Sequence, residues 1–341
     1  MAPDGARAAL GRVLAAIPPA SGAVVMGTGI VSIGLSLDSH ETLSRALLAI
    51  DAVVWIALGL LLASRLAWDR DRARLEARSP AALTGVAGTA VLGTRLVLLG
   101  WSWAGIGLLA IAVSFWLLLL PPVLGHWKTP TVGVSFVLTV STESLAVLAA
   151  TIAEREGSTG LLDASLAPFL LGLVFYLFVI SRFDLRQLLV GRGDHWITGG
   201  ALAISTLAAG RITLGAQSLG ALGGIEEALQ DVSLALWGLT MVWLPVLLAA
   251  EAQRPRLEYD VRRWSTVFPV GMYAACSFIA GAAASAPALT DFARVWVWAG
   301  LGVWVVVFVA MLRNGIRLAR GEHPPADSRR IREIAPSRGG S

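Results

Sequence analysis

Polar side chains recur at helical spacing inside several long apolar stretches of this chain. Residues three, four or seven positions apart share one face of a helix. Three sets fit such spacing: Ser21, Thr28 and Ser32; Ser135, Thr139 and Glu143; and Thr198 and Ser205. Their hydroxyl dipoles could solvate an anion along a pathway that has no fixed cation to trap it. Hydrogen bonding between packed helices is the alternative for each hydroxyl alone, but the whole set favours a pathway lining.

Glu143 is the one acidic residue that we place deep inside an apolar stretch. Carboxylates at such positions are costly and are functional candidates by default. Three hypotheses follow: Glu143 pairs with Arg95 or Arg211, it is protonated and neutral, or it couples proton movement to transport. A bare carboxylate would repel an anion, so we favour a paired or protonated Glu143 in a structural role.

Phe268 and Pro269 follow two arginines at the start of another apolar stretch. A proline inside a helix removes a backbone hydrogen bond and kinks the helix. A phenyl ring one residue before such a kink could close a narrow pathway. Packing is the commoner role of a helical aromatic residue, so the pair alone is a weak signal.

Enzyme signatures are missing from the sequence. The four histidines fall in predicted loops or in the polar tail, without metal-ligand spacing: His40, His126, His195 and His323. The single cysteine, Cys276, excludes an internal disulfide. We therefore predict no metal, no cofactor and no enzymatic activity. A membrane-embedded enzyme would need a clustered catalytic constellation, and a purely structural or receptor role would leave the hydroxyl sets unexplained.

The composition of the chain indicates that these residues lie in a membrane-spanning protein. The chain is 56% hydrophobic and 15% charged, whereas soluble domains carry about 25% charged residues. Its basic residues lie in short clusters between apolar runs, which is typical of the cytoplasmic face of a membrane protein rather than of a nucleic-acid-binding protein.

Ten apolar stretches are long enough to cross a bilayer, which takes about 20 residues. They are 18–37, 43–66, 80–100, 104–125, 131–153, 163–181, 196–216, 229–250, 264–285 and 292–313. We predict an all-α integral membrane protein with a cytoplasmic segment at 1–16, a ten-helix domain at 17–316 and a flexible cytoplasmic tail at 317–341. Only five of the 27 basic residues fall on one side of this arrangement: Arg45, Arg95, Arg155, Arg211 and Arg294. Both termini are therefore expected in the cytoplasm, with the chain in the cell (inner) membrane.

Odd-numbered and even-numbered spans differ in composition. The odd spans are rich in small residues, as in SGAVVMGTGIVSIG, whereas the even spans are bulky, as in SFWLLLLPPVL. The deeper tryptophans all lie on even spans: Trp55, Trp116, Trp237, Trp243 and Trp304. Small residues let helices approach closely in lipid. We therefore predict five helical hairpins whose odd helices form an inner ring around a central pore and whose even helices surround it.

Four segments carry a resemblance to a known family: PASGAVVMGTGIVSIG (19–34), TVSTESLAVLAA (139–150), GDHWITGGALAIST (193–206) and STVFPVGMYA (265–274). They resemble the tellurite-resistance and C4-dicarboxylate transporter family, which includes TehA-like channels, fungal malate and sulfite transporters and plant slow anion channels. The resemblance covers all ten spans.

The resemblance implies ten helices as five hairpins, a homotrimer with one pore per subunit, and a phenylalanine on the ninth helix that occludes the pore. Phe268 is the matching position. The expected function is gated transport of small anions, with chloride, nitrate, sulfite or a C4-dicarboxylate such as malate as candidates. Arg95 and Arg211 could attract anions to the outer mouth. The alternative is a proton-coupled dicarboxylate carrier that uses Glu143.

Overall fold

The computed structural model describes residues 17–190, 193–255 and 259–321. Within these residues, ten helices are long and apolar enough to cross a membrane. The helices are α2 (Gly22–Leu37), α3 (Glu41–Trp68), α5 (Thr84–Leu98), α6 (Ser102–Gly125), α7 (Val137–Glu156), α8 (Thr159–Ile180), α10 (Ile197–Leu219), α11 (Glu226–Gln253), α12 (Trp264–Ala283) and α13 (Pro287–Ala319). Each corresponds to one predicted span. The predicted all-α, multi-pass membrane class is therefore confirmed.

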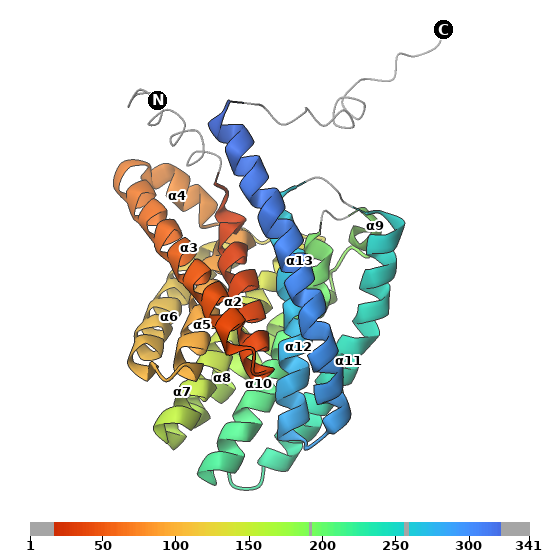
Figure 1. The fold of residues 1–341 in the computed structure, drawn as a ribbon. Helices are drawn as coiled ribbons and strands as arrows, with labels where there is room; N and C mark the ends of the chain where they lie inside the picture. Colours follow the sequence, from red (N-terminus) through yellow and green to blue (C-terminus); the bar gives the residue numbers. More distant parts are fainter. Residues whose placement is uncertain (1–16, 191–192, 256–258, 322–341) are drawn as a thin grey trace. The chain divides into compact units, whose positions relative to one another are not determined.

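The odd-numbered spans form a closed inner ring. Helix α2 packs against α5, α5 against α7, α7 against α10, α10 against α12, and α12 returns to α2 (Figure 1). In the most apolar part of these five spans 72–100% of the residues are buried, against 17–28% in the even-numbered spans. The predicted division into inner and outer helices is thus confirmed.

Glycines let the inner helices approach closely. A Cβ atom on Gly22 of α2 would lie 2.6 Å from the backbone of Thr84 on α5. A Cβ on Gly271 of α12 would lie 2.8 Å from the Ile30 side chain on α2. Such contacts are the ones that small residues permit between membrane helices. They explain why the odd spans contain glycine at these positions.

Tryptophans of the outer helices join neighbouring hairpins. Their indole N–H groups donate to hydroxyls of an inner helix outside their own hairpin: Trp55 to Thr89 (2.9 Å), Trp116 to Thr142 (3.0 Å), Trp237 to Ser277 (2.8 Å) and Trp304 to Thr28 (3.0 Å). In each case the acceptor lies on the inner helix of the next hairpin, and Trp304 of the last hairpin reaches α2 of the first. A buried indole N–H needs such a partner, so the deep tryptophans and several inner hydroxyls have a shared structural role.

The chain divides into a large unit, residues 18–307, and a small unit formed by its two ends. In the small unit the structure describes residue 17 and residues 308–321, and α13 remains helical through Ala319. The predicted tail at 317–341 therefore begins inside a helix. The predicted N-terminal segment, 1–16, and residues 322–341 lie outside the described residues.

Candidate functional site

Each inner span opens with a short 3₁₀ turn. The turns are η1 (Pro19–Ser21), η2 (Pro80–Leu83), η3 (Gly133–Phe136), η4 (Asp194–Trp196) and η5 (Val261–Arg263). Proline suits such a start because its fixed φ is helical and its missing N–H would be unpaired there anyway. Proline begins η1 and η2, and side chains cap two turns: Ser79 caps η2, and Asp260 caps η5. The five inner helices therefore begin in a common way.

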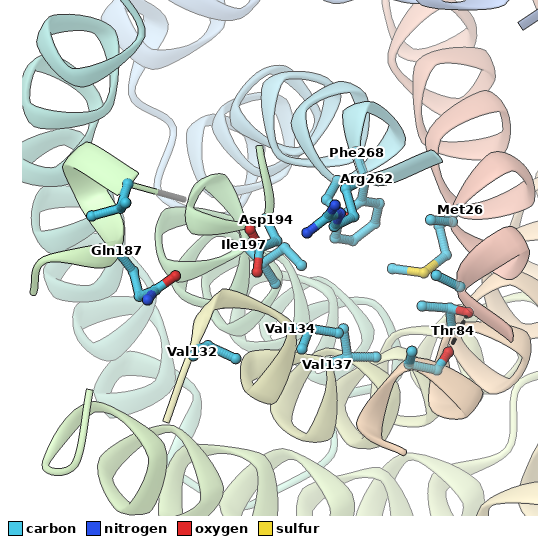
Figure 2. A pocket seen from close by; sticks show the side chains of 15 residues that line it. Met26, Thr84, Val132, Val134, Val137, Gln187, Asp194, Ile197, Arg262 and Phe268 are labelled. Carbon is cyan, nitrogen blue, oxygen red and sulfur yellow. Dashed lines mark hydrogen bonds between the residues drawn. The ribbon is translucent and has the colours of Figure 1, made fainter. Parts of the chain in front are cut away.

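These five turns surround a cavity of about 430 Å³ at one end of the ring (Figure 2). Each turn contributes one lining residue, and the helix that follows it contributes a second one three positions later. The lining consists of Ala20, Ala23, Met26, Ala81, Thr84, Val132, Val134, Val137, Gln187, Val190, Asp194, Ile197, Arg262, Ser265 and Phe268. Gln187 and Val190 come from the short helix α9 (Gln187–Val190). All five inner spans thus meet at this cavity, which we call the N-terminal vestibule.

Five helix N-termini give the N-terminal vestibule a field that favours anions. Each N-terminus carries a partial positive charge from its aligned peptide dipoles and unpaired N–H groups. The charged side chains in the lining are Arg262 and Asp194, so their formal charges cancel. Arg262 is also hydrogen-bonded to Asp260, with Nε 3.1 Å from both carboxylate oxygens. The attraction for an anion therefore comes mainly from the helix ends.

Phe268 lies on the face of α12 that lines the N-terminal vestibule. It follows Arg262 and Ser265 at intervals of three residues, and all three line the cavity. Figure 2 shows its ring directed into the cavity between Arg262 and Met26. The side chain is 1% exposed. The ring is therefore part of the wall of the N-terminal vestibule and has little contact with solvent.

Pro269 lies next to Phe268 inside α12. The helix continues from Trp264 to Ala283 through Pro269 without a break. The proline ring packs on α10, where a Cβ atom on Gly200 would lie 2.7 Å from its Cγ. Pro269 and Gly200 therefore set the approach of two inner helices beside Phe268, and the predicted kink stays a prediction.

Several hydroxyls predicted to line the pathway form hydrogen bonds to neighbouring helices. Thr28 accepts the Trp304 indole N–H, and Ser32 lies 3.0 Å from the hydroxyl of Ser44 on α3. Ser205 donates to both carboxylate oxygens of Glu143, at 2.9 and 2.7 Å. For these three residues the structure favours helix–helix hydrogen bonding, the alternative left open by the sequence.

The other hydroxyls predicted to line the pathway do not bond to the side chain of a neighbouring helix among the described residues. Ser135 accepts from the backbone N–H of Val132 at 3.2 Å, and Ser21 is buried in η1. Thr139 and Thr198 are fully buried, and their hydroxyl oxygens have no hydrogen-bond partner among the described residues. A buried hydroxyl without a partner is costly unless water or a solute reaches it. For these two threonines the predicted contact with a solute stays a prediction.

Glu143 is enclosed between an inner pair of helices and an outer helix. It bonds to Ser205 of α10, and it packs on α8, where a Cβ on Gly172 would lie 2.1 Å from its Cγ. Of the three hypotheses for Glu143, an ion pair is not found among the described residues: Arg95 bonds to Glu41 at 2.8 Å, and Arg211 pairs with Glu154 at 3.6 Å. The protonated form of Glu143 remains a prediction.

Arg95 and Arg211 lie in the second half of α5 and α10, away from the helix starts that form the N-terminal vestibule. They are 0% and 5% exposed. Arg95 also donates through Nε to the Ser44 hydroxyl at 2.8 Å. Because Glu41 and Glu154 offset their charges, these arginines are less able to attract anions than the sequence suggested.

Three residues in or near the site were not predicted from the sequence: Arg262, Asp194 and Asp51. Arg262, Ser265 and Phe268 follow one another at intervals of three residues, and this spacing in the sequence could have indicated that Arg262 lies on the same face as Phe268. Asp51 lies within the predicted span 43–66, so Glu143 is not the one deep acidic residue. Asp51 is 0% exposed, and neither carboxylate oxygen has a hydrogen-bond partner among the described residues. It faces Gly29 of α2, where a Cβ would lie 2.8 Å from Oδ2.

Comparison with known proteins gives a family match over most of the chain. The family described as voltage-dependent anion channel matches residues 16–312. Two relatives are uncharacterized membrane proteins of Mycobacterium tuberculosis, from strains CDC 1551 / Oshkosh and ATCC 25618 / H37Rv, and each is 32% identical over 125 residues. The match covers 35% of this chain and spans 63% of the length of each relative.

Proposed function

Since the chain belongs to the voltage-dependent anion channel family, we propose that it conducts small anions through a pore within each subunit and that Phe268 gates this pore. The family implies anion transport across a membrane rather than catalysis. Candidate anions are chloride, nitrate, sulfite and a C4-dicarboxylate such as malate. The bilayer is the medium in which the protein works.

The observation that carries this proposal is the N-terminal vestibule. Five helix N-termini converge there, and Phe268 lies where the vestibule meets the closed ring of inner helices. Helix N-termini stabilise anions without a fixed cation that would hold them. Thr139 and Thr198 would continue the pathway with hydroxyl groups, since their oxygens have no partner among the described residues.

We also propose that the protein lies in the cell (inner) membrane with both termini in the cytoplasm, so that the N-terminal vestibule opens on that side. The uneven distribution of basic residues supports this orientation. The resemblance to TehA-like channels supports a homotrimer with one pore in each subunit.

A proton-coupled dicarboxylate carrier is the second candidate. It is favoured by the fully buried Glu143, which has a hydroxyl partner but no ion pair among the described residues. Such a carboxyl could bind and release a proton during transport. However, Glu143 is enclosed by Ser205 and Gly172, a position that fits helix packing better than solute contact.

Flux from proteoliposomes distinguishes the two candidates. Vesicles loaded with chloride, nitrate or malate are compared with and without a pH gradient, for the original protein and Glu143→Gln. We expect faster efflux than from loaded vesicles that lack the protein. We also expect no effect of the pH gradient and the same flux in Glu143→Gln. Malate flux that needs a pH gradient, and loses this need in Glu143→Gln, would instead establish the carrier.

Removing the positive or the negative charge of the N-terminal vestibule is expected to change anion flux in opposite directions. Arg262→Gln leaves Asp194 and Asp260 uncompensated at the mouth, so anion flux should fall about threefold to tenfold at low ionic strength. Asp194→Asn keeps the side-chain shape and removes the repulsive charge, so flux should rise by a similar factor. Both effects should shrink at 1 M salt, where screening is strong. Changes of the same sign, or changes that high salt leaves intact, would contradict an electrostatic role.

A further inference from the structure

A second hollow lies outside the inner ring, between outer helices α3 and α6. Its volume is about 570 Å³, and we call it the α3–α6 groove. It is lined by Gly22, Val25, Trp55, Leu58, Gly59, Leu62, Ala63, Leu66, Gly85, Thr89, Ala110, Ile111, Ser114 and Phe115. Its few polar side chains already have partners: Trp55 bonds to Thr89, and Ser114 bonds to the Ala110 carbonyl at 2.8 Å. The groove therefore suits an apolar occupant.

Glycines keep the α3–α6 groove open on its outer side. A Cβ atom on Gly59 or Gly85 would meet no atom within 4 Å. Beside the groove, the α3 side chains of Val53 and Leu60 are 66% and 68% exposed. In a membrane-spanning chain, such apolar residues face lipid hydrocarbon. The lining of α3 runs from Trp55 to Leu66, about 16 Å of helix at 1.5 Å per residue, a length comparable with an extended acyl chain.

Basic residues lie at the Leu66 end of the α3–α6 groove. Arg70 donates through Nε to the backbone carbonyl of Leu66 at 3.1 Å, so its side chain lies at the rim. Arg70 opens α4 (Arg70–Glu76), a short helix at the end of α3 (Figure 1). Trp68 beside it is 85% exposed, as expected for an aromatic residue at the membrane–water interface. The groove therefore reaches the level of lipid headgroups.

The charges around α4 leave a positive surface. Its acidic residues face other arginines: Glu76 bonds to Arg65 and Arg72, and Asp71 lies 3.5 Å from Arg74. Arg70 and Arg78 are exposed, and no ion pair to a carboxylate is found for either among the described residues. Basic residues at the membrane surface attract anionic lipids.

We propose that the α3–α6 groove is a binding site for an anionic phospholipid. One acyl chain lies along α3 between Trp55 and Leu66, and the phosphate group is held by Arg70 and Arg78. The site is separate from the N-terminal vestibule and does not depend on which solute the pore conducts. Its ligand is a structural lipid bound to each subunit.

Native mass spectrometry of the purified full-length protein, with added phosphatidylglycerol or phosphatidylcholine, tests this proposal. The original protein should retain one phosphatidylglycerol per subunit in preference to phosphatidylcholine. Arg70→Gln with Arg78→Gln should reduce that preference about tenfold or more, given the contribution of each juxtamembrane charge. The matched control Arg182→Gln with Arg186→Gln removes two exposed arginines elsewhere and should leave it unchanged.

A substitution that fills the α3–α6 groove tests the contact with the acyl chain separately from the contact of the arginines with the phosphate group. Gly59→Phe places a ring in open space and should abolish retention of both lipids, whereas Gly302→Phe, at an equally open glycine on α13, should not. Unchanged retention in Gly59→Phe would overturn the proposal. A loss of subunit association in Gly59→Phe, without a lipid effect, would also overturn it and would identify the groove as a contact between copies of this chain.

Discussion

Replacing Phe268 with alanine is expected to raise anion flux by about tenfold or more, because the ring lies where the N-terminal vestibule meets the inner helices. A hydrophobic constriction stops ions by excluding water from the narrowest part of a pore. Removing the ring widens this part and lets water enter. Stopped-flow measurement of chloride and nitrate efflux from proteoliposomes gives the rate directly.

The controls for this substitution separate the gate from general loosening of the protein. Phe268→Leu keeps part of the apolar volume and should give an intermediate rate. Phe136→Ala removes another fully buried phenyl ring, which packs on Tyr176 and Phe183 rather than lining the vestibule, so it should lower stability without raising flux. Equal rates in Phe268→Ala and Phe136→Ala would show that Phe268 is not the gate.

Replacing Gly172 with alanine is expected to lower the stability of the protein by about 1–3 kcal/mol, the usual cost of overpacking. The new Cβ would lie 2.1 Å from the Glu143 Cγ, so α8 and α7 would have to separate. Glu143 would also shift away from the Ser205 hydroxyl, which lies 2.7 Å from its Oε2. Thermal unfolding in detergent, followed by loss of the monodisperse species, measures the change.

A double-mutant cycle tests whether Gly172 is there to make room for Glu143. Glu143→Ala removes the Cγ atom that the new methyl would meet. The double variant Gly172→Ala/Glu143→Ala should therefore be less destabilised than the sum of the two single variants, as expected for residues in contact. Strictly additive losses would mean that the two residues do not constrain each other and would reopen a role for Glu143 in proton transfer.

Much of the fold follows from composition along the chain. Small residues in the odd spans and bulky residues in the even spans predicted the inner ring, since small residues let helices approach closely and glycine alone permits the contact of Gly22 with Thr84. The deep tryptophans on even spans were visible in the sequence, but their partners were not. Trp55 and Trp116 bond to threonines on the next inner helix, and this depends on how hairpins are ordered around the ring.

The site was less predictable, because helical periodicity places a residue on a face without saying what that face meets. Thr28 and Thr139 fit the same expectation, yet Thr28 bonds to an outer tryptophan and Thr139 has no partner among the described residues. Arg95 was a possible partner of Glu143 because it is an arginine near the end of an odd span, whereas it bonds to Glu41 near the start of α3. Tertiary contacts determine which partner each side chain bonds to, and a local sequence pattern does not contain this information.

The most direct measurement is the reversal potential of Phe268→Ala in a planar bilayer with a potassium chloride gradient. If anions cross the pore from the N-terminal vestibule past position 268, the variant should carry a steady current that reverses close to the chloride equilibrium potential. The original protein should carry much less current under the same conditions. No current from the variant, or a reversal close to the potassium equilibrium potential, would contradict a pore for anions gated by Phe268.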